Sequence, residues 1–196
     1  MQHLCELVRK YAGRLPEGTP VAAKSLLHLG KRAAIDQALS RMTERGQLLR
    51  VGRGVYVAPV ESRFGTRAPS VELAVQAFSA QRGEVIVSSG AAAANALGLT
   101  TQVPIRAVYL TSGRSREMKL GNQIVELRHA PRWQLALAGR PAGQMIRALG
   151  WLGPEKAEKT IRKFKLKHPA VVDEMATVTP LLPTWLAEAI LKVVHG

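Results

Sequence analysis

Cysteine is nearly absent from this sequence of 196 residues, which contains only Cys5. This excludes an internal disulfide and any zinc site built from several cysteines. Cys5 lies among Leu4, Leu7 and Val8, so we expect a buried thiol and not a nucleophile. Aromatic residues are also scarce, at 5%. The core must therefore be mainly aliphatic.

Acidic residues are few relative to basic ones. The chain has 14 Asp and Glu against 28 Lys and Arg, a formal net charge of +14. Such an excess favours a polyanionic partner, although a GC-rich genome that encodes arginine freely would give the same balance. The first 60 residues hold 10 basic and 4 acidic residues, and residues 132–196 hold 10 and 5. The excess is therefore concentrated at the two ends.

Long hydrophobic runs are missing as well. No segment approaches the roughly 18 apolar residues that a membrane span requires, and Glu6, Arg9 and Lys10 interrupt the N-terminal segment too early for a signal peptide. We therefore expect a cytoplasmic protein without a membrane partner.

The sequence also lacks the motifs of catalysis. Its histidines, His3, His28, His129, His168 and His195, show no metal-ligand spacing. Asp36, Asp173 and Glu174 form no nuclease or nucleotidyltransferase signature. The turn Ser88-Ser89-Gly90 could bind an anion at a helix N-terminus, but it lacks the glycine spacing and the lysine of a phosphate loop. We expect no enzyme, no cofactor and no metal.

The N-terminal third has the pattern of a helix-turn-helix. Helical periodicity covers residues 3–12, 22–29 and 31–45, and Gly30 and Gly46 end the last two segments. The third segment carries one apolar stripe, formed by Ala34, Ile35, Ala38, Leu39 and Met42. A short helix and a longer one, joined by a glycine turn, are typical of this motif.

A β-hairpin is predicted directly after the third helix. Residues 48–51 and 55–57 are β-prone and flank the turn Gly52-Arg53-Gly54. A hairpin in this position is the wing of a winged helix-turn-helix, and its tip would place Arg53 in or near a minor groove.

The polar face of the third helix supplies the candidate DNA-binding residues. Arg32, Asp36 and Gln37 lie near its N-terminal end, where side chains reach base edges. Lys31, Arg41 and Arg50 are expected to hold phosphates. The full predicted set is Lys31, Arg32, Asp36, Gln37, Ser40, Arg41, Arg50 and Arg53. For any one of these residues, a solvated helix surface is the alternative interpretation.

Two runs in this region resemble a known family. Residues 29–42, LGKRAAIDQALSRM, and 45–57, RGQLLRVGRGVYV, are similar to the recognition helix "GxR…ALSRL" and the wing "GxLxRVxRGxY" of AbiEi-like antitoxins of type IV toxin-antitoxin systems. Met42 replaces the usual leucine, and Lys31 replaces a small polar residue. Fainter similarity continues through residues 88–91, 95–104 and 181–186.

The resemblance implies a phage-defence antitoxin that acts as a transcriptional autorepressor. Its partners would be double-stranded operator DNA, with inverted repeats, and a cognate nucleotidyltransferase-like toxin that it neutralises directly or functionally. The residues themselves indicate only DNA binding. Two alternatives stay open: a stand-alone repressor whose distal domain senses a ligand, and an RNA-binding module. The oligomeric state on DNA is also open.

The rest of the chain predicts a second domain. Residues 61–69 read as a linker between a winged helix-turn-helix at 1–60 and a domain at 70–196. Ser70 is expected to cap a helix reaching residue 80. Strands at 84–87, 105–111, 118–120 and 123–128 predict a small mixed sheet, and helices are expected at 141–149, 154–166 and 182–194. The predicted fold class is α+β.

One helix of this domain carries a basic stripe. Ala157, Ile161 and Phe164 are expected to face inward. The opposite side holds the tentative partner-binding residues Lys156, Lys159, Arg162, Lys163 and Lys167. The stripe could bind an acidic toxin surface, RNA or further DNA, or it could be a solvated face.

Overall fold

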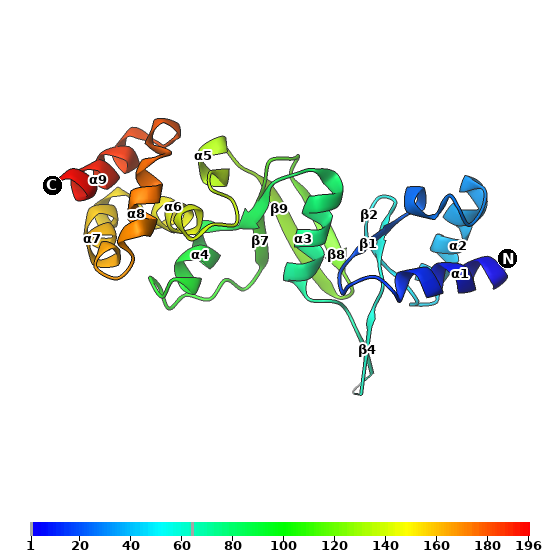
Figure 1. The fold of residues 1–196 in the computed structure, drawn as a ribbon. Helices are drawn as coiled ribbons and strands as arrows, with labels where there is room; N and C mark the ends of the chain where they lie inside the picture. The colour runs from blue at the N-terminus through cyan, green and yellow to red at the C-terminus, as the bar shows by residue number, and fades with distance from the viewer. Residues whose placement is uncertain (1, 64) are drawn as a thin grey trace. The chain divides into compact units, whose positions relative to one another are not determined.

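The computed structural model describes residues 2–63 and 65–196. The fold is α+β, with small sheets and a helical C-terminal third, as predicted. The chain forms two compact units (Figure 1). Unit 1 comprises the chain up to Glu84 together with Arg116–Glu126, and unit 2 comprises Val85–Ser115 and Leu127–Gly196. Within the described residues, no helix is both long and apolar enough to cross a membrane.

Unit 1 begins with two α-helices and a small sheet. The elements are α1 (Gln2–Ala12), β1 (Pro20–Ala22), the 3₁₀ helix η1 (Ala23–Leu26), α2 (Arg32–Glu44), β2 (Leu49–Gly52) and β3 (Val55–Val57). The strands pair antiparallel in the order β1-β3-β2, with Val21 opposite Tyr56.

Local sequence signals explain α2 and the hairpin. Ile35, Leu39 and Met42 of α2 are fully or almost fully buried in the core of unit 1. Gly46 and Gly54 take φ values of +70° and +69°, so each provides a left-handed residue where the helix ends and where the hairpin turns. The predicted helix and hairpin are therefore present.

The second predicted helix is shorter than expected. Residues 22–29 contain only the single 3₁₀ turn η1. The Ser25 hydroxyl donates a hydrogen bond to the Ala22 carbonyl at 2.7 Å, and such a side-chain bond competes with helical backbone bonding. The prediction for Cys5 also needs correction, because its side chain is half-buried at the edge of the core.

The helix α3 (Val71–Arg82) belongs to unit 1, and not to a domain that begins at residue 70. Its N-cap is Ser70, as predicted, whose hydroxyl accepts from the Leu73 N–H at 3.2 Å. Gly18 lies so close that a Cβ there would come within 2.8 Å of the Ala74 nitrogen. The strand β8 (Arg116–Leu120) is also part of unit 1. The division into compact units therefore falls after Glu84, later than the boundary expected near residue 69, because these contacts are made by distant segments.

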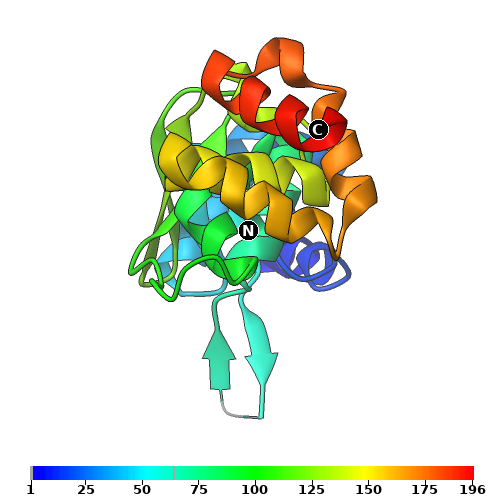
Figure 2. The same cartoon turned by 90° about the vertical axis from the view of Figure 1, so that its left-hand side faces the viewer.

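The predicted linker at 61–69 contains a second hairpin. The strands β4 (Val60–Ser62) and β5 (Gly65–Arg67) pair antiparallel, and Figure 2 shows the hairpin projecting from the unit. Residue 64 lies outside the described residues. At the base of the hairpin, Arg67 Nη1 lies 3.0 Å from a Glu17 carboxylate oxygen, and the Ser70 N–H donates to the same oxygen. The Arg67 hydrogen bond, followed by that of Ser70, lowers the pKa of Glu17.

Unit 2 combines part of a sheet with a helical bundle. The four-stranded sheet has the order β6-β7-β9-β8, and β9 (Gln123–His129) passes from unit 1 into unit 2. The other elements of unit 2 are β6 (Ile86–Ser88), α4 (Gly90–Ala96), β7 (Ala107–Thr111), α5 (Arg132–Leu135), α6 (Pro141–Leu152), α7 (Pro154–Lys165), α8 (Pro169–Ala176), η2 (Thr179–Leu181) and α9 (Thr184–His195). The helix α8 was not predicted, because its eight residues are too few to show a clear period.

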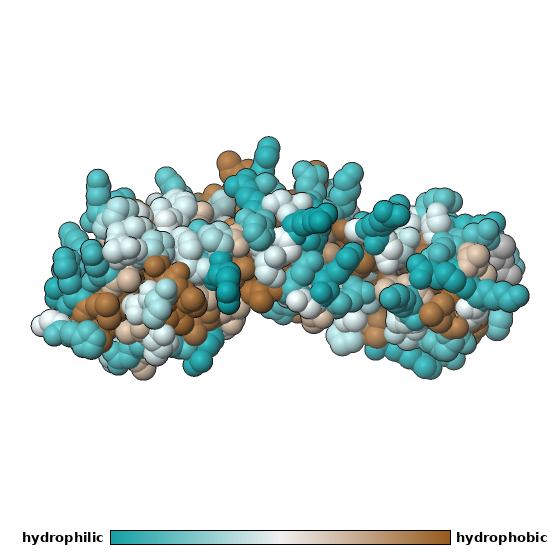
Figure 3. All heavy atoms as spheres, turned by 90° about the horizontal axis from the view of Figure 1, so that it is seen from above, coloured by the Kyte–Doolittle hydropathy of each residue, from teal (hydrophilic) through white to brown (hydrophobic). Residues whose placement is uncertain are grey.

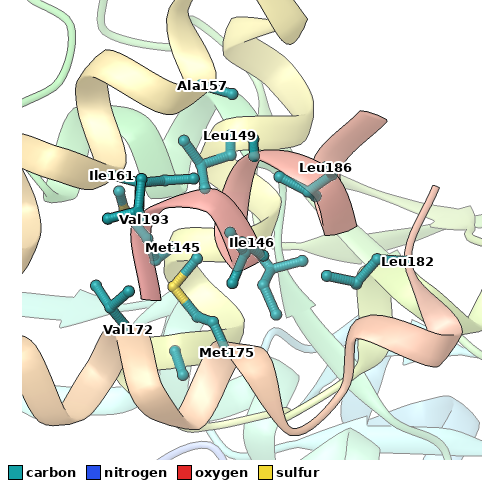
Figure 4. Packing of buried hydrophobic residues seen from close by; sticks show 13 residues of the cluster. Met145, Ile146, Leu149, Ala157, Ile161, Val172, Met175, Leu182, Leu186 and Val193 are labelled. Carbon is teal, nitrogen blue, oxygen red and sulfur yellow. The ribbon is translucent and has the colours of Figure 1, made fainter. Parts of the chain in front are cut away.

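The helices of unit 2 enclose an aliphatic core. Met145 and Ile146 of α6 meet Ile161 of α7, Met175 of α8 and Leu186 of α9 (Figure 4). All five side chains have no exposed surface. Burying each contributes about 1.5–3 kcal/mol of hydrophobic free energy, so α6 is held from several sides.

A buried arginine lies on the same helix. Arg147 is 5% exposed, and its Nε and Nη1 atoms have no hydrogen-bond partner among the described residues. Burial lowers its pKa to about 10. An uncompensated buried charge opposes folding, so the apolar contacts of α6 must outweigh it.

We predict that Gly18→Ala destabilises unit 1 by about 2–4 kcal/mol. The substitution forces alanine into the left-handed region, which costs about 1–2 kcal/mol, and it also presses a methyl group onto the α3 backbone, where overpacking costs about 1–3 kcal/mol. Gly46→Ala is the matched control, because its φ is also positive but nothing lies within 4 Å of the added Cβ. Urea unfolding followed by circular dichroism measures both variants.

Tryptophan fluorescence supplies an internal reference in the same samples, because Trp133, Trp151 and Trp185 all belong to unit 2. Equal destabilisation by the two substitutions would show that the close approach of Gly18 to α3 is unimportant.

Candidate nucleic-acid interface

The outward face of α2 carries the polar residues predicted for DNA contact. Arg32, Asp36 and Gln37 are all exposed, whereas Ala38 and Leu39 are buried on the opposite side. Lys31 is the N-cap and makes no side-chain capping bond, and the first turn contains no acidic residue. The first N–H groups of α2 and the positive end of its dipole can therefore meet an anion.

Two of the three predicted base-reading residues contact each other. Arg32 Nε donates to Asp36 Oδ2 at 2.9 Å, and their side chains are 54% and 52% exposed. An exposed pair four residues apart on a helix contributes about 0.3–0.5 kcal/mol. A good bidentate contact to a base contributes about 1–3 kcal/mol, so a base can displace this pairing.

The second half of α2 holds the next candidates. Ser40 Oγ donates to Glu44 Oε1 at 3.4 Å, a weak bond within the helix. Arg41 lies beside it and is exposed. Both side chains lie on the outward face of α2, but farther along the helix than its N-terminal end, where side chains are predicted to read bases.

The β2–β3 hairpin presents two arginines. Arg53 is exposed in the turn, and Arg50 lies on β2, where its Nε donates weakly to the Gly52 carbonyl at 3.4 Å. The pairing shifts register between Arg50 and Gly52, which is the mark of a β-bulge. Bulges turn a strand and redirect its side chains, so the tip of the hairpin is not a simple extension of the strands.

The strand β8 lies beside this hairpin, and residues of both line a shallow pocket of about 310 Å³. Arg50, Arg53, Lys119 and Glu117 contribute to its lining. Met118 and Leu120 of β8 are buried, so the alternating Glu117 and Lys119 face outward. Sequence reasoning missed Lys119. The alternation of apolar and polar residues along β8 can be seen in the sequence, but which strand lies next to the hairpin depends on tertiary packing.

Arg116, on the same strand, has a structural role. Its Nη2 atom lies 2.5 Å from Glu84 Oε2, and its guanidinium lies 5.1 Å from the centre of the Phe78 ring. A Cβ added to Gly52 of the hairpin would lie 3.9 Å from the same ring, so the ring lies close to this part of the hairpin. Arg116 therefore helps to fix the layer beneath the hairpin.

The basic stripe of unit 2 lies partly along a groove of about 930 Å³. Of the predicted partner-binding residues, Lys159, Arg162 and Lys163 line the groove, whereas Lys156 and Lys167 do not. Arg162 is paired with Glu158 at 2.9 Å. The prediction missed the apolar residues that share the lining, Leu166, Pro169 and Val193.

The turn Ser88-Ser89-Gly90, considered as an anion site from the sequence, leads into the short helix α4. The Ser89 hydroxyl caps α4 by accepting from the Ala92 N–H at 3.4 Å, and α4 has only seven residues. Among the described residues, no group of three or more His, Cys, Asp or Glu side chains is placed to hold a metal ion.

Comparison with protein families places the chain in one family. Residues 8–171 match the model of DUF6088, described as a family of unknown function. The chain belongs to this family. No curated protein and no solved structure matches the chain. The resemblance to AbiEi-like antitoxins therefore stays a prediction.

Proposed function

We propose that this member of DUF6088 is a transcription regulator that binds double-stranded operator DNA through unit 1. The main support is that α2 and the β2–β3 hairpin, which both expose cations, are joined by the short turn at residues 45–48. The N–H groups of Gln47 and Leu48 bond to the Met42 carbonyl, at 2.8 and 3.3 Å. The hairpin therefore starts from the last turn of α2 at a defined position.

The exposed residues suit different parts of a duplex. In this proposal α2 enters the major groove, where Arg32 and Gln37 contact base edges. Asp36 orients Arg32 through their ion pair. Lys31 and the N–H groups at the start of α2 hold a phosphate, as helix N-termini commonly do on DNA.

The hairpin and β8 extend this surface. Arg53 would lie in or beside the minor groove, where Arg50 and Lys119 add positive charge. Arg41 would contact the backbone from the second half of α2. The proposal gives a role to seven of the eight residues predicted from the sequence, all except Ser40, and adds Lys119.

We predict that Arg53→Ala and Lys119→Ala each weaken operator binding and reduce its salt dependence. Removal of one phosphate contact should lower the slope of log K against log salt by about 0.9. Fluorescence anisotropy with the region upstream of the gene, over a salt series, measures this slope. Lys10→Ala, on the exposed face of α1, is the control and should leave the slope unchanged. An unchanged slope for Arg53→Ala would remove the hairpin from the interface.

We predict a different result for Arg32→Ala and Gln37→Ala. These variants should lose discrimination between operator and non-operator DNA, by about 1–3 kcal/mol for each base contact removed. Competition binding with a set of single-base operator variants measures this. If the affinity falls by the same factor on every sequence, the two side chains hold phosphates and do not read bases.

We also propose, following the resemblance, that the chain is the antitoxin of a nucleotidyltransferase-like toxin. The groove of unit 2 favours this proposal over DNA binding alone, because it combines cations with an apolar lining. The same groove is the observation that would support a ligand-sensing repressor or an RNA-binding module if a protein partner is not found.

The antitoxin proposal predicts growth rescue. Co-expression of the whole chain with the product of the neighbouring gene, from independent promoters, should restore growth that this product inhibits. Arg53→Ala should rescue growth as well as the wild type does, because transcription from these promoters does not depend on the operator. Failure of the wild-type chain to rescue, with both proteins expressed, would contradict the antitoxin proposal and leave the DNA-binding proposal standing.

A further inference from the structure

We propose that the groove between α7 and the C-terminal end of α9 binds an acidic segment of a protein partner. One apolar side chain of that segment would cover Leu166, and its carboxylates would pair with Lys159 and Lys163. This inference rests on the antitoxin part of the proposed function, because it requires a protein partner, but it is independent of operator binding.

The floor of the groove is apolar and exposed. Leu166 directly follows the end of α7 and is 86% exposed, and Pro169 and Val193 line the groove beside it. Figure 3 shows hydrophobic surface gathered among polar side chains over the helices of unit 2, at the left. An exposed apolar side chain in a groove is the feature that a partner's side chain can cover.

The rim supplies unpaired positive charge. Lys159 and Lys163 lie one helical turn apart, a rise of about 6 Å along α7. Both side chains are exposed, and neither forms an ion pair or a side-chain hydrogen bond with any residue that the structure describes. Carboxylates at a similar spacing on a partner would meet both.

The walls of the groove are already held in place. Lys165 Nζ donates to the Val193 carbonyl at 2.7 Å, which ties α7 to the end of α9. Arg162 Nε and Nη2 both donate to Glu158 Oε1, at 3.1 and 2.9 Å. These bonds already hold the side chains of Lys165 and Arg162 in place. A partner therefore has fewer side chains to immobilise when it binds.

The lining favours a protein over a nucleic acid. No aromatic residue is among its described residues, so the groove has no platform on which unpaired bases stack. A phosphate backbone carries a charge on every nucleotide, so along the groove it would meet the carboxylate of Glu155, whereas Glu158 is already paired with Arg162. An acidic segment can instead place its carboxylates on the two lysines and turn its other side chains away from these glutamates.

The experiment uses the whole chain and a labelled amphipathic peptide with a leucine stripe flanked by glutamates. We expect saturable binding by fluorescence anisotropy. Leu166→Asp and the double variant K159E/K163E should each weaken binding at least tenfold. The double variant K156E/K167E is the matched control for K159E/K163E, because it makes the same charge change at two lysines outside the groove lining, and its effect should be less than threefold.

Three outcomes would overturn the inference. The first is that the peptide does not bind. The second is that K156E/K167E weakens peptide binding as much as K159E/K163E does, which indicates unspecific charge attraction. The third is that single-stranded RNA binds instead, and its binding is abolished in K159E/K163E but retained in Leu166→Asp. Circular dichroism and retained operator binding verify that each variant is folded, and they separate failure at this groove from failure of the DNA-binding proposal.

Discussion

The packing of α2 against the small sheet of unit 1 is the contact on which the candidate interface depends. Ile35, Leu39 and Met42 share one buried cluster with Leu48, which directly precedes the hairpin, and with Tyr56, which lies in its second strand. This contact turns the polar face of α2 outward and fixes where the hairpin begins. Without the apolar stripe, the same arginines would lie on a helix with no defined orientation toward a duplex, and charge alone would give only sequence-independent attraction.

Sequence signals were sufficient where structure is local. The structure has α2 at Arg32–Glu44, β2 and β3 on either side of Gly54, and the Ser70 cap of α3, because periodicity, glycine and capping residues act over a few positions. The assignment of α3 and β8 to unit 1 was not predictable in this way. It depends on Gly18 meeting α3 and on Phe78 lying beneath Gly52, which are contacts between segments far apart in the sequence.

The candidate site shows the same division. Residue type and helical face were enough to select Arg32, Gln37 and Arg53. The spacing of Arg32 and Asp36 also allowed their ion pair, which the predicted roles did not include. Lys119 and Leu166 were missed for a different reason. Lys119 matters because β8 lies beside the hairpin, and Leu166 because the chain after α7 leaves it exposed in a groove. A sequence pattern does not encode either neighbourhood.

The positive charge of the chain does not describe a single site. Unit 1 carries 15 basic and 9 acidic residues, and unit 2 carries 13 and 5, yet the surroundings of these charges differ. In unit 1 the cations lie with polar side chains on a helix and a hairpin, a setting suited to phosphates and base edges. In unit 2 two exposed lysines border an apolar floor, a setting suited to carboxylates on a partly apolar partner. A phosphate backbone gains nothing from covering Leu166. The net charge alone suggests one polyanionic partner, whereas the surroundings of the charges favour the two different partners that we propose.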